Sequence, residues 1–262
     1  MDEWMREKET AEAAAEAAGE AAHELFRAEF DTDTKDGKTD YVTTADHEAQ
    51  EAAVGAVRDA FPDDGIVAEE GDAAKTVPEG GRFWVIDPID GTSNFVRGMP
   101  VWTSSVGLVV DGEPVAAANY MPAVGDKYVA GADGMRLNGD TVGVSDATDH
   151  ETFSVVPTVW WEHHRRDEFA EVSRRIVTEF GDLLRVGSAQ ASLSMLASGA
   201  VEGVVTNVEV EPWDSVAGVH MVRSGGGVVT DAEGRRWTTG SEGLVASNGE
   251  DHGAVLGTVT DL

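Results

Sequence analysis

The sequence predicts a mixed fold, α+β in its first half and α/β in its second. Short runs of β-branched and aromatic residues dominate the first half, and two of them flank Asp111-Gly112, a dipeptide typical of hairpin turns. After about residue 145, stretches typical of strands alternate with stretches of helical periodicity, which is the pattern of α/β units. We therefore expect an N-terminal half over residues 1–148 and a C-terminal half over residues 149–262, packed together with a site in the cleft between them.

The first expected element is a long amphipathic helix. Apolar residues from Trp4 to Phe26 recur every three or four positions, as they do on the buried face of a helix. A second helix is expected to begin near Asp46 and to end at Pro62, because proline has no amide hydrogen for the helical pattern. In the second half, helices are expected at residues 166–180, 188–198 and 213–224.

The expected strands are short and mostly apolar. One of them, residues 82–86, reads Arg-Phe-Trp-Val-Ile and ends abruptly at Asp87. This sudden change to a charged residue makes the end of the strand a candidate functional site. The other strands are expected at residues 66–68, 104–110, 115–120, 127–130, 153–156 and 201–206.

The charge balance and residue usage exclude several classes of function. The chain carries 49 Asp and Glu against 19 Lys and Arg, so its field repels phosphate backbones and nucleic acid is not an expected partner. The absence of cysteine excludes disulfides, thiolate metal sites and a cysteine nucleophile. The first 30 residues do not read as a signal peptide, and no apolar run approaches the ~20 residues of a membrane span. We therefore expect a soluble cytoplasmic protein that does not bind membranes.

The acidic excess also resembles the composition of proteins from extreme halophiles. The formal net charge is −30, and only five of the basic residues are lysines. Most carboxylates are expected at the solvated surface, where molar salt shortens the screening length to ~3 Å and makes their repulsion tolerable. We interpret this composition as a sign of a salt-rich cytoplasm and not of a particular function.

The strongest functional signal is the segment Trp-Val-Ile-Asp-Pro-Ile-Asp-Gly-Thr-Ser-Asn-Phe at residues 84–95. Asp87 and Asp90 follow an apolar strand three residues apart, so both carboxylates can converge at its end. Gly91 allows close backbone approach, and Thr92 can open a helix whose free N–H groups would bind an anion. An apolar strand seldom ends in paired acids without a cation or other partner to hold them. The segment therefore indicates a place where metal and phosphate meet.

This segment resembles the first motif of the inositol monophosphatase family of lithium-sensitive, metal-dependent phosphatases. Further segments are similar to motifs of that family and follow in its order: residues 40–46 (Asp-Tyr-Val-Thr-Thr-Ala-Asp), 68–70 (Ala-Glu-Glu, where the family usually begins with Gly), 137–139 (Leu-Asn-Gly) and 213–218 (Trp-Asp-x-x-Ala-Gly), followed by Gly225-Gly226. An ordered match over nearly the whole chain is far harder to obtain by chance than any single motif. The resemblance, nearest to the archaeal type, implies an αβαβα layered sandwich of the inositol monophosphatase and fructose-1,6-bisphosphatase kind.

The resemblance also implies a site for two or three Mg²⁺ ions. Carried over by position, the ligands of the first ion would be Glu69, Asp87 and the carbonyl of Ile89. The second ion would be held by Asp87, Asp90 and Asp214, so that Asp87 bridges the two. Independently of the resemblance, these ligands are all hard oxygens, which suit Mg²⁺ better than Zn²⁺.

The family mechanism would give roles to residues around these ions. A metal-activated water would attack phosphorus in line, oriented by Glu69 and Thr92, with Asp46 behind Thr92. The backbone N–H groups of Gly91 and Thr92 would hold the phosphate. Asp46 is also a residue that caps helices, and this structural role stays open beside the catalytic one.

Some positions stay undecided. A loop lysine near the third ion is common in the family, and Lys35 and Lys38 are equal candidates. Trp160 and Trp161 would form either an exposed contact surface or a cover for the core. A homodimer is expected, although no residue determines the oligomeric state, and lithium sensitivity is equally undetermined. Packing or solvent contact is the expected role of three histidines: His163, His164 and His220.

The expected substrate is a small phosphorylated sugar or polyol. Gly187, Ser188 and Ala189 are expected to line the sugar pocket. Family members specialised for inositol phosphate usually carry a Glu that contacts the sugar hydroxyls, and here that position falls on Asn207 or Thr206, neither of them acidic. An inositol-1-monophosphatase-like activity is expected, and fructose 1,6-bisphosphate and 3′-phosphoadenosine 5′-phosphate are the alternative substrates.

The alternative outside enzymes is a sugar-phosphate-binding regulatory protein. Such a sensor would be expected to have lost at least one metal ligand, whereas every ligand position and Thr92 are intact in this sequence. We therefore favour a phosphoric monoester hydrolase.

If the acidic surface needs screening, stability should depend on salt. Carboxylate repulsion destabilises the compact state in dilute buffer, and folded domains are stable by only ~5–15 kcal/mol. We expect the melting temperature to rise along a KCl series in which the screening length falls from ~10 Å at 0.1 M to ~3 Å at 1 M. Mg²⁺ should raise it further than ionic strength explains, because it binds only the folded state. A melting temperature that stays constant along the KCl series would contradict the halophilic interpretation but not the catalytic one.

Overall fold

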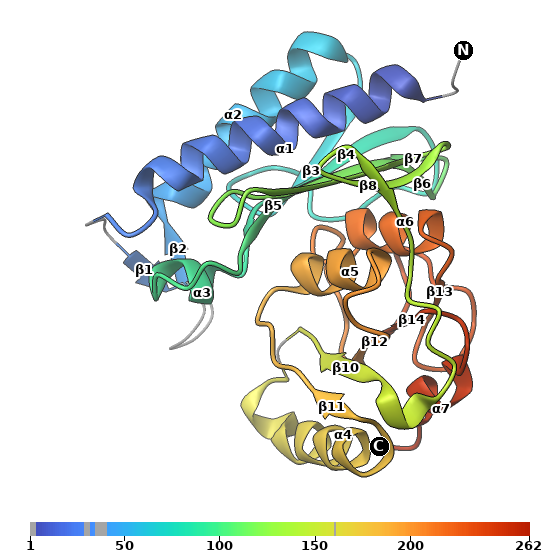
Figure 1. Cartoon of the computed structure of the whole chain (residues 1–262). Coiled ribbons are helices and arrows are strands. Elements are labelled where there is room, and N and C mark those ends of the chain that lie inside the picture. The colour runs from blue at the N-terminus through green and yellow to red at the C-terminus, as the bar shows by residue number, and fades with distance from the viewer. Residues whose placement is uncertain (1–3, 29–31, 35–40, 160) are drawn as a thin grey trace.

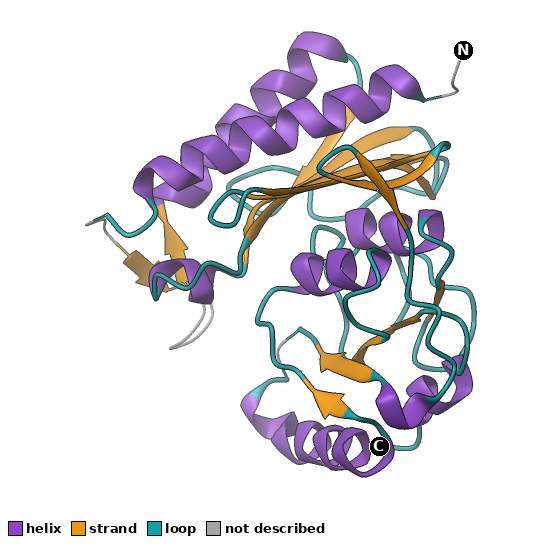
Figure 2. Cartoon of the chain, viewed as in Figure 1, coloured by secondary structure: helices purple, strands orange, loops and turns teal. Residues whose placement is uncertain are grey.

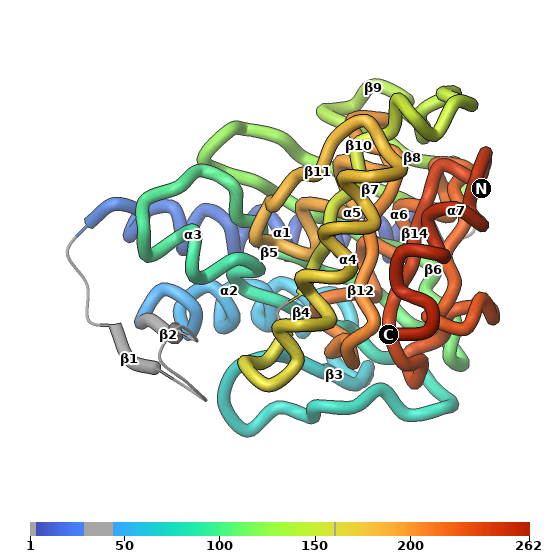
Figure 3. Tube along the Cα trace, turned by 90° about the horizontal axis from the view of Figure 1, so that it is seen from below, coloured from blue at the N-terminus to red at the C-terminus, as the bar shows by residue number. Residues whose placement is uncertain are grey.

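The computed structural model describes residues 4–28, 32–34, 41–159 and 161–262, and it consists of alternating layers of helices and sheets (Figure 1). Two long helices lie on one face of a seven-stranded sheet, and two shorter helices separate its other face from a five-stranded sheet (Figure 2). A last layer of helices covers the far face of the second sheet (Figure 3). In this order the helices are α1 (Met5–Leu25) with α2 (Thr44–Ala60), α5 (Ala189–Ala197) with α6 (Val216–Ser224), and α4 (Arg166–Glu179) with α7 (His252–Gly257). The αβαβα fold class expected from the sequence is confirmed.

The seven-stranded sheet is a meander whose spatial order follows the chain. Only β3 and β4 are parallel, and the other neighbours are antiparallel. Asp111 and Gly112 connect β5 to β6 with φ values of 48° and 84°, which confirms the predicted hairpin. The strands are β3 (Gly65–Ala68), β4 (Arg82–Asp90), β5 (Thr103–Val110), β6 (Glu113–Met121), β7 (Asp126–Gly131), β8 (Gly134–Leu137) and β9 (Asp140–Val142).

The five-stranded sheet mixes both directions in the order β11-β10-β12-β14-β13. β10 is parallel to β11 and β12, whereas β14 is antiparallel to β12 and β13. Its strands are β10 (Ser154–Pro157), β11 (Asp182–Leu183), β12 (Gly203–Thr206), β13 (Val228–Thr230) and β14 (Leu244–Ser247). The remaining elements are the antiparallel pair β1 (Thr32–Thr34) and β2 (Tyr41–Thr43) and the short helices α3 (Thr92–Val96), η1 (His150–Thr152) and η2 (His163–Arg165).

Each predicted helix and strand has a counterpart, with ends displaced by a few residues. The strands that the sequence did not predict are short, and β8 and β9 lie on either side of the tight turn Asn138-Gly139. Within the described ranges, no helix combines the length and the apolar character that crossing a bilayer requires.

Small residues let α1 lie close to the first sheet. Its buried face is made of alanines that are fully covered by α2 and the sheet: Ala11, Ala14, Ala15, Ala18 and Ala22. A Cβ atom at Gly19 would lie 2.5 Å from the Tyr120 ring and 2.8 Å from Pro122, so only glycine fits there. Glycine inside a helix costs about 1 kcal/mol relative to alanine, and close packing of α1 on β6 offsets that cost.

The predicted end of the strand at Asp87 is wrong, because β4 continues to Asp90. Its register with β5 shifts between these two residues, where Asp87 pairs with Ser105 and Asp90 with Thr103. Pro88 has no N–H to donate to a ladder, which explains an irregularity at this point. Side chains three apart on a regular strand face opposite sides of the sheet, whereas a register shift re-aims one of them. The irregularity therefore lets both carboxylates reach the same place.

Candidate active site

Three aspartates from distant parts of the chain lie together. One carboxylate oxygen from each of Asp87, Asp90 and Asp214 lies within 4.8 Å of the others. The two on β4 are nearly fully buried, with 1% and 6% of their surfaces exposed, whereas Asp214 is half-buried just before α6. The fold thus gathers acidic side chains where the first sheet meets the middle helix layer.

Asp87 lies in an environment that disfavours its negative charge. Burial raises the pKa of Asp87 well above its usual value, and the neighbouring Glu69 carboxyl raises it further through charge and a hydrogen bond. Its Oδ1 atom is buried and has no hydrogen-bond partner among the residues that the structure describes. Grouped hard oxygens of this kind are ligands that Mg²⁺ prefers, and a divalent cation would offset their repulsion. The residues present therefore fit the metal expected from the sequence.

Asp90 is held by the N-terminus of α5. The hydroxyl of Ser188 and the N–H of Gln190, the latter at 2.7 Å, donate to Asp90 Oδ2, and the N–H of Ala189 donates to Oδ1 at 3.2 Å. Burial raises the pKa of Asp90, and these hydrogen bonds lower it in part. Ser188 and Ala189, which the sequence suggested for the sugar pocket, are themselves buried, at 3% and 5% exposure. In the structure they orient an aspartate.

Gln190 connects the Asp90 side of the site to the Asp214 side. Its side chain is fully buried, and Nε2 donates to the carbonyl of Trp213 at 2.5 Å. Its Oε1 accepts from the N–H of Gly218 at 2.8 Å and from Asn119 Nδ2 at 3.2 Å. One amide thus joins α5, α6 and β6 beside the carboxylates. Sequence reasoning missed this residue, since a single glutamine in a helix gives no sign of its distant partners.

A compact turn precedes Asp214 and sets its direction. The N–H of Asp214 donates to the carbonyl of Glu211 at 3.1 Å, and the Ser215 hydroxyl donates to the same carbonyl at 2.9 Å. The N–H of Val216, the first residue of α6, donates to the carbonyl of Pro212, four residues earlier. Helix-like hydrogen bonding therefore begins in the turn before α6. The helix begins at Val216, three residues later than predicted.

The Gly91-Thr92 corner follows β4 directly. Gly91 has a φ of 92°, and a Cβ atom there would lie 3.1 Å from Ser188 Cβ, so glycine is required. The Thr92 hydroxyl donates at 3.0 Å to the carbonyl of Ile89, which is the predicted ligand carbonyl. The first helical bond of α3 runs from Asn94 N–H to Gly91 O at 2.8 Å, so the amides of residues 91 and 92 precede the helical pattern.

Glu69 and Asp46 come from two earlier elements, the end of β3 and the start of α2. Glu69 follows β3, and its N–H donates to Ile86 O at 3.3 Å, which keeps the residue beside β4. Asp46 is fully buried in the first turn of α2, and β2, which directly precedes that helix, packs against α3. The predicted placement of Asp46 behind Thr92 stays a prediction.

Two candidate substrate residues are engaged elsewhere. Asn207 accepts a hydrogen bond from Trp161 Nε1 at 2.6 Å and donates one to Glu168 at 2.7 Å. Thr206 is fully buried in β12. Trp161 is 1% exposed and packs on Phe169 with ring centroids 5.0 Å apart, so of the two roles considered for it, it covers the core.

The remaining predicted positions are distributed as follows. Gly187 has a φ of 82°, and a Cβ atom there would lie 3.1 Å from the Asn94 amide. Lys35, Lys38 and Trp160 lie outside the described residues, so the third-ion lysine is not located.

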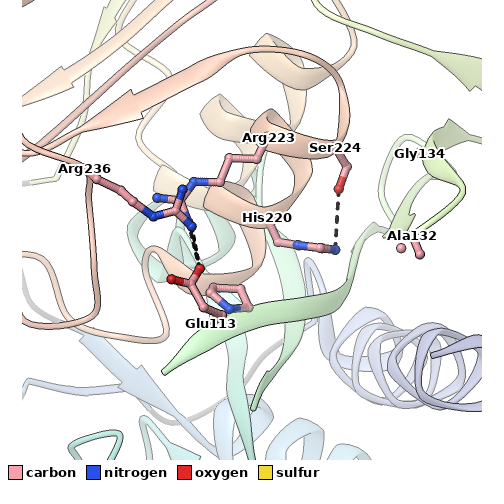
Figure 4. Close-up of a pocket in the computed structure, with 9 residues that line it drawn as sticks. Glu113, Ala132, Gly134, His220, Arg223, Ser224 and Arg236 are labelled. Carbon is pink, nitrogen blue, oxygen red and sulfur yellow. Dashed lines mark hydrogen bonds and ion pairs between the residues drawn. The ribbon is translucent and has the colours of Figure 1, made fainter. Parts of the chain in front are cut away.

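A pocket of about 360 Å³ lies at the end of α6 opposite the acidic cluster (Figure 4). Arg236 forms an ion pair with Glu113 at 2.6 Å, and Arg223 lies 3.8 Å from the same carboxylate. Burial, together with the charge of Arg223, lowers the pKa of His220 to about 4, so this histidine is neutral at pH 7. Its Nε2 atom lies 3.5 Å from Ser224 Oγ. The structure thus gives His220 a packing role among arginines.

The layered fold and its acidic cluster define a class of protein, the phosphatases that work with carboxylate-bound metal ions. The sequence model of the inositol monophosphatase family matches residues 4–262, and the chain belongs to this family.

Several known proteins are similar along most of the chain. A Thermotoga maritima protein named fructose-1,6-bisphosphatase/inositol-1-monophosphatase is 34% identical over 229 residues, covering 87% of this chain and 86% of its own. The Nus factor SuhB of Vibrio cholerae is 31% identical over 226 residues, covering 85% and 84%. Among solved structures, an IMPase from Thermotoga maritima matches with a TM-score of 0.89 at 30% identity, covering 98% of both chains.

Proposed function

We propose that this chain hydrolyses phosphate monoesters of inositol and small sugars with the help of Mg²⁺. The observation that carries the proposal is the convergence of Asp87, Asp90 and Asp214, with a buried Asp87 oxygen that has no hydrogen-bond partner in the described part of the chain. Clustering buried carboxylates is costly, and proteins keep such arrangements where they bind cations. A protein that only sensed sugar phosphates would not need three of them.

For the metal site we propose two or three ions with a shared ligand. Glu69, Asp87 and the Ile89 carbonyl would hold the first ion, and the Glu69 hydrogen bond to Asp87 supports this grouping. Asp87, Asp90 and Asp214 would hold the second, and their mutual distances support it. When bound, the ions would lower the pKa of a water molecule and neutralise charge on the phosphate and on the leaving group.

The protein groups near the proposed ions have separate tasks. Glu69 and Thr92 would orient the attacking water, with Asp46 supporting Thr92, and the contact between Thr92 and the Ile89 carbonyl favours this arrangement. The amides of Gly91 and Thr92 would hold the phosphate, since they precede the hydrogen bonding of α3.

The substrate pocket is proposed to be permissive. Asn207, where specialised relatives usually carry a Glu, already uses its amide on Trp161 and Glu168. Gly187 would border the sugar, whereas Ser188 and Ala189 would act through Asp90. The double name of the Thermotoga maritima relative supports both inositol 1-phosphate and fructose 1,6-bisphosphate as substrates. Among the described residues, no contact favours 3′-phosphoadenosine 5′-phosphate.

We also propose that residues 1–148 and 149–262 form two halves that share the site. The first sheet takes its strands from residues 65–142 and carries Asp87 and Asp90, whereas Asp214 comes from the second half. We further propose that the protein is a homodimer and that it works in a salt-rich cytoplasm. The acidic composition supports the second of these two proposals.

Metal dependence is the direct test of the function. The site offers only oxygen ligands, so EDTA should abolish phosphate release from inositol 1-phosphate and Mg²⁺ should restore it. High Ca²⁺ should inhibit, because its larger and more flexible coordination misplaces the attacking water. The assay is phosphate release at high KCl. Activity that survives exhaustive chelation would end the metal-based mechanism.

Neutralising single ligands tests the assignment of the second ion. Asp90→Asn and Asp214→Asn keep shape and remove one charge each, and turnover should fall at least ~100-fold, as for loss of several kcal/mol of transition-state stabilisation. Circular dichroism should report a retained fold. We would withdraw the assignment if either variant kept wild-type turnover at saturating Mg²⁺.

Substrate breadth follows from the occupied amide of Asn207. Neither Asn207 nor Thr206 is acidic, and the Asn207 amide is already used, so this position offers the sugar hydroxyls none of the charge-assisted hydrogen bonds worth ~1.5–3 kcal/mol each. The kcat/KM values for inositol 1-phosphate and fructose 1,6-bisphosphate should therefore differ by less than ~1,000-fold, which corresponds to about 4 kcal/mol. A larger preference, measured by phosphate release, would mean that another residue supplies the discrimination.

A further inference from the structure

Hydrogen bonds within the short loop after β3 hold the main chain of the proposed ligand Glu69. The Lys75 ammonium donates to two carbonyls, that of Ala68 at 2.9 Å and that of Glu69 at 2.7 Å. The N–H of Ala68 in turn donates to Ala74 O at 3.2 Å. The loop therefore closes on the main chain of Glu69 through one of the five lysines of an acidic chain.

The same ammonium also reaches the other side of the site. Lys75 Nζ lies 5.7 Å from the ring centroid of Trp213, the residue that precedes Asp214. At this distance a cation is attracted to the electron-rich face of an indole. Lys75 thus contacts the backbone that carries one proposed ligand and the side chain next to another.

A second set of hydrogen bonds holds Glu70, the residue after Glu69, and it comes from Gln50 and not from Lys75. The Gln50 amide of α2 donates to Glu70 O at 2.9 Å and accepts from Glu70 N–H at 2.8 Å. Gln50 therefore fixes the loop to the helix layer, whereas Lys75 links it toward Trp213. Of these two links, only the one through Lys75 joins the Glu69 loop to the turn that carries Asp214.

We infer that Lys75 is a positioning residue that holds Glu69 and the Trp213-Asp214 turn in register for Mg²⁺ binding. This inference rests on the proposed function, because it concerns the same ions. Groups that orient metal ligands change metal affinity about 10–100-fold when removed. Lys75 is exposed, so its replacement leaves no cavity in the core.

A purely electrostatic role for Lys75 predicts the opposite result. A positive charge beside Glu69 repels Mg²⁺, so its removal alone would strengthen metal binding. A role only in loop stability would lower the melting temperature without changing the Mg²⁺ dependence. The direction of the change in Mg²⁺ affinity therefore distinguishes positioning from both.

The test compares Lys75→Met, Lys75→Arg and a matched control, Lys127→Met. Methionine keeps an apolar stem of similar shape and removes charge and donors, whereas arginine keeps both. Lys127 lies on β7 and pairs with Glu12 at 2.7 Å and Glu16 at 2.5 Å on α1, so its loss removes the same charge away from the site. Two quantities are measured: the Mg²⁺ concentration that gives half of the Mg²⁺-induced rise in melting temperature, and the half-saturating Mg²⁺ for phosphate release.

We expect Lys75→Met to raise both half-saturating concentrations about 10-fold, with a smaller effect on kcat at saturating Mg²⁺, and Lys75→Arg to restore most of the affinity. Lys127→Met should leave both concentrations unchanged. Unchanged or tighter Mg²⁺ binding in Lys75→Met, or an equal loss in Lys127→Met, would overturn the inference. So would a wild-type protein whose melting does not respond to Mg²⁺. Melting that responds to Mg²⁺ without phosphate release would refute the proposed function, while the melting arm would still decide the role of Lys75.

Discussion

The hydrogen bonds from the N-terminus of α5 to the carboxylate of Asp90 tie the first sheet to the middle helix layer at the site. Asp90 ends a strand of the first sheet, whereas α5 belongs to the middle layer that also packs on the second sheet. A carboxylate buried to 6% exposure needs donors, and a helix N-terminus offers N–H groups and a favourable dipole. Because Gln190 extends the same connection to Trp213, moving the middle layer would disrupt Asp90 and the Asp214 turn together.

Asp87 has a different environment from Asp90, and the difference lies in its hydrogen-bond partners. Hydrogen bonds satisfy Asp90, whereas Asp87 keeps a buried oxygen without a partner in the described part of the chain, and burial raises its pKa. A site whose ligands are already held by the fold loses little energy to rearrangement when a cation arrives. A bound ion would then compensate the charge of Asp87, as the hydrogen-bond donors of α5 compensate the charge of Asp90. In the proposed site both carboxylates are metal ligands, but only Asp90 is also oriented by hydrogen bonds from α5.

Local signals in the sequence located the five longest helices and half of the strands, whereas the αβαβα layering was expected only from the family resemblance. Helical periodicity located α1 and α2, and Asp111-Gly112 located a hairpin, because these features depend on neighbouring residues. The pairing of Asp87 with Asp90 was visible from the strand before them, whereas Asp214 entered only through the family resemblance. The register shift in β4, the bonds of Gln190 and the occupied amide of Asn207 were not predictable, since their partners lie tens of residues away in the chain.

The acidic side chains of this protein fall into two physical classes that respond differently to salt. With a net charge of −30, most of them repel one another through solvent, where mobile ions shorten the range of the interaction. Buried carboxylates are screened far less, so each must be compensated by a local partner. Asp231, 3% exposed, has Arg235 at 2.8 Å, and Asp90 has the donors of α5. For Asp87 the proposed function supplies a specifically bound cation as that partner, which is a local interaction that mobile salt ions do not provide.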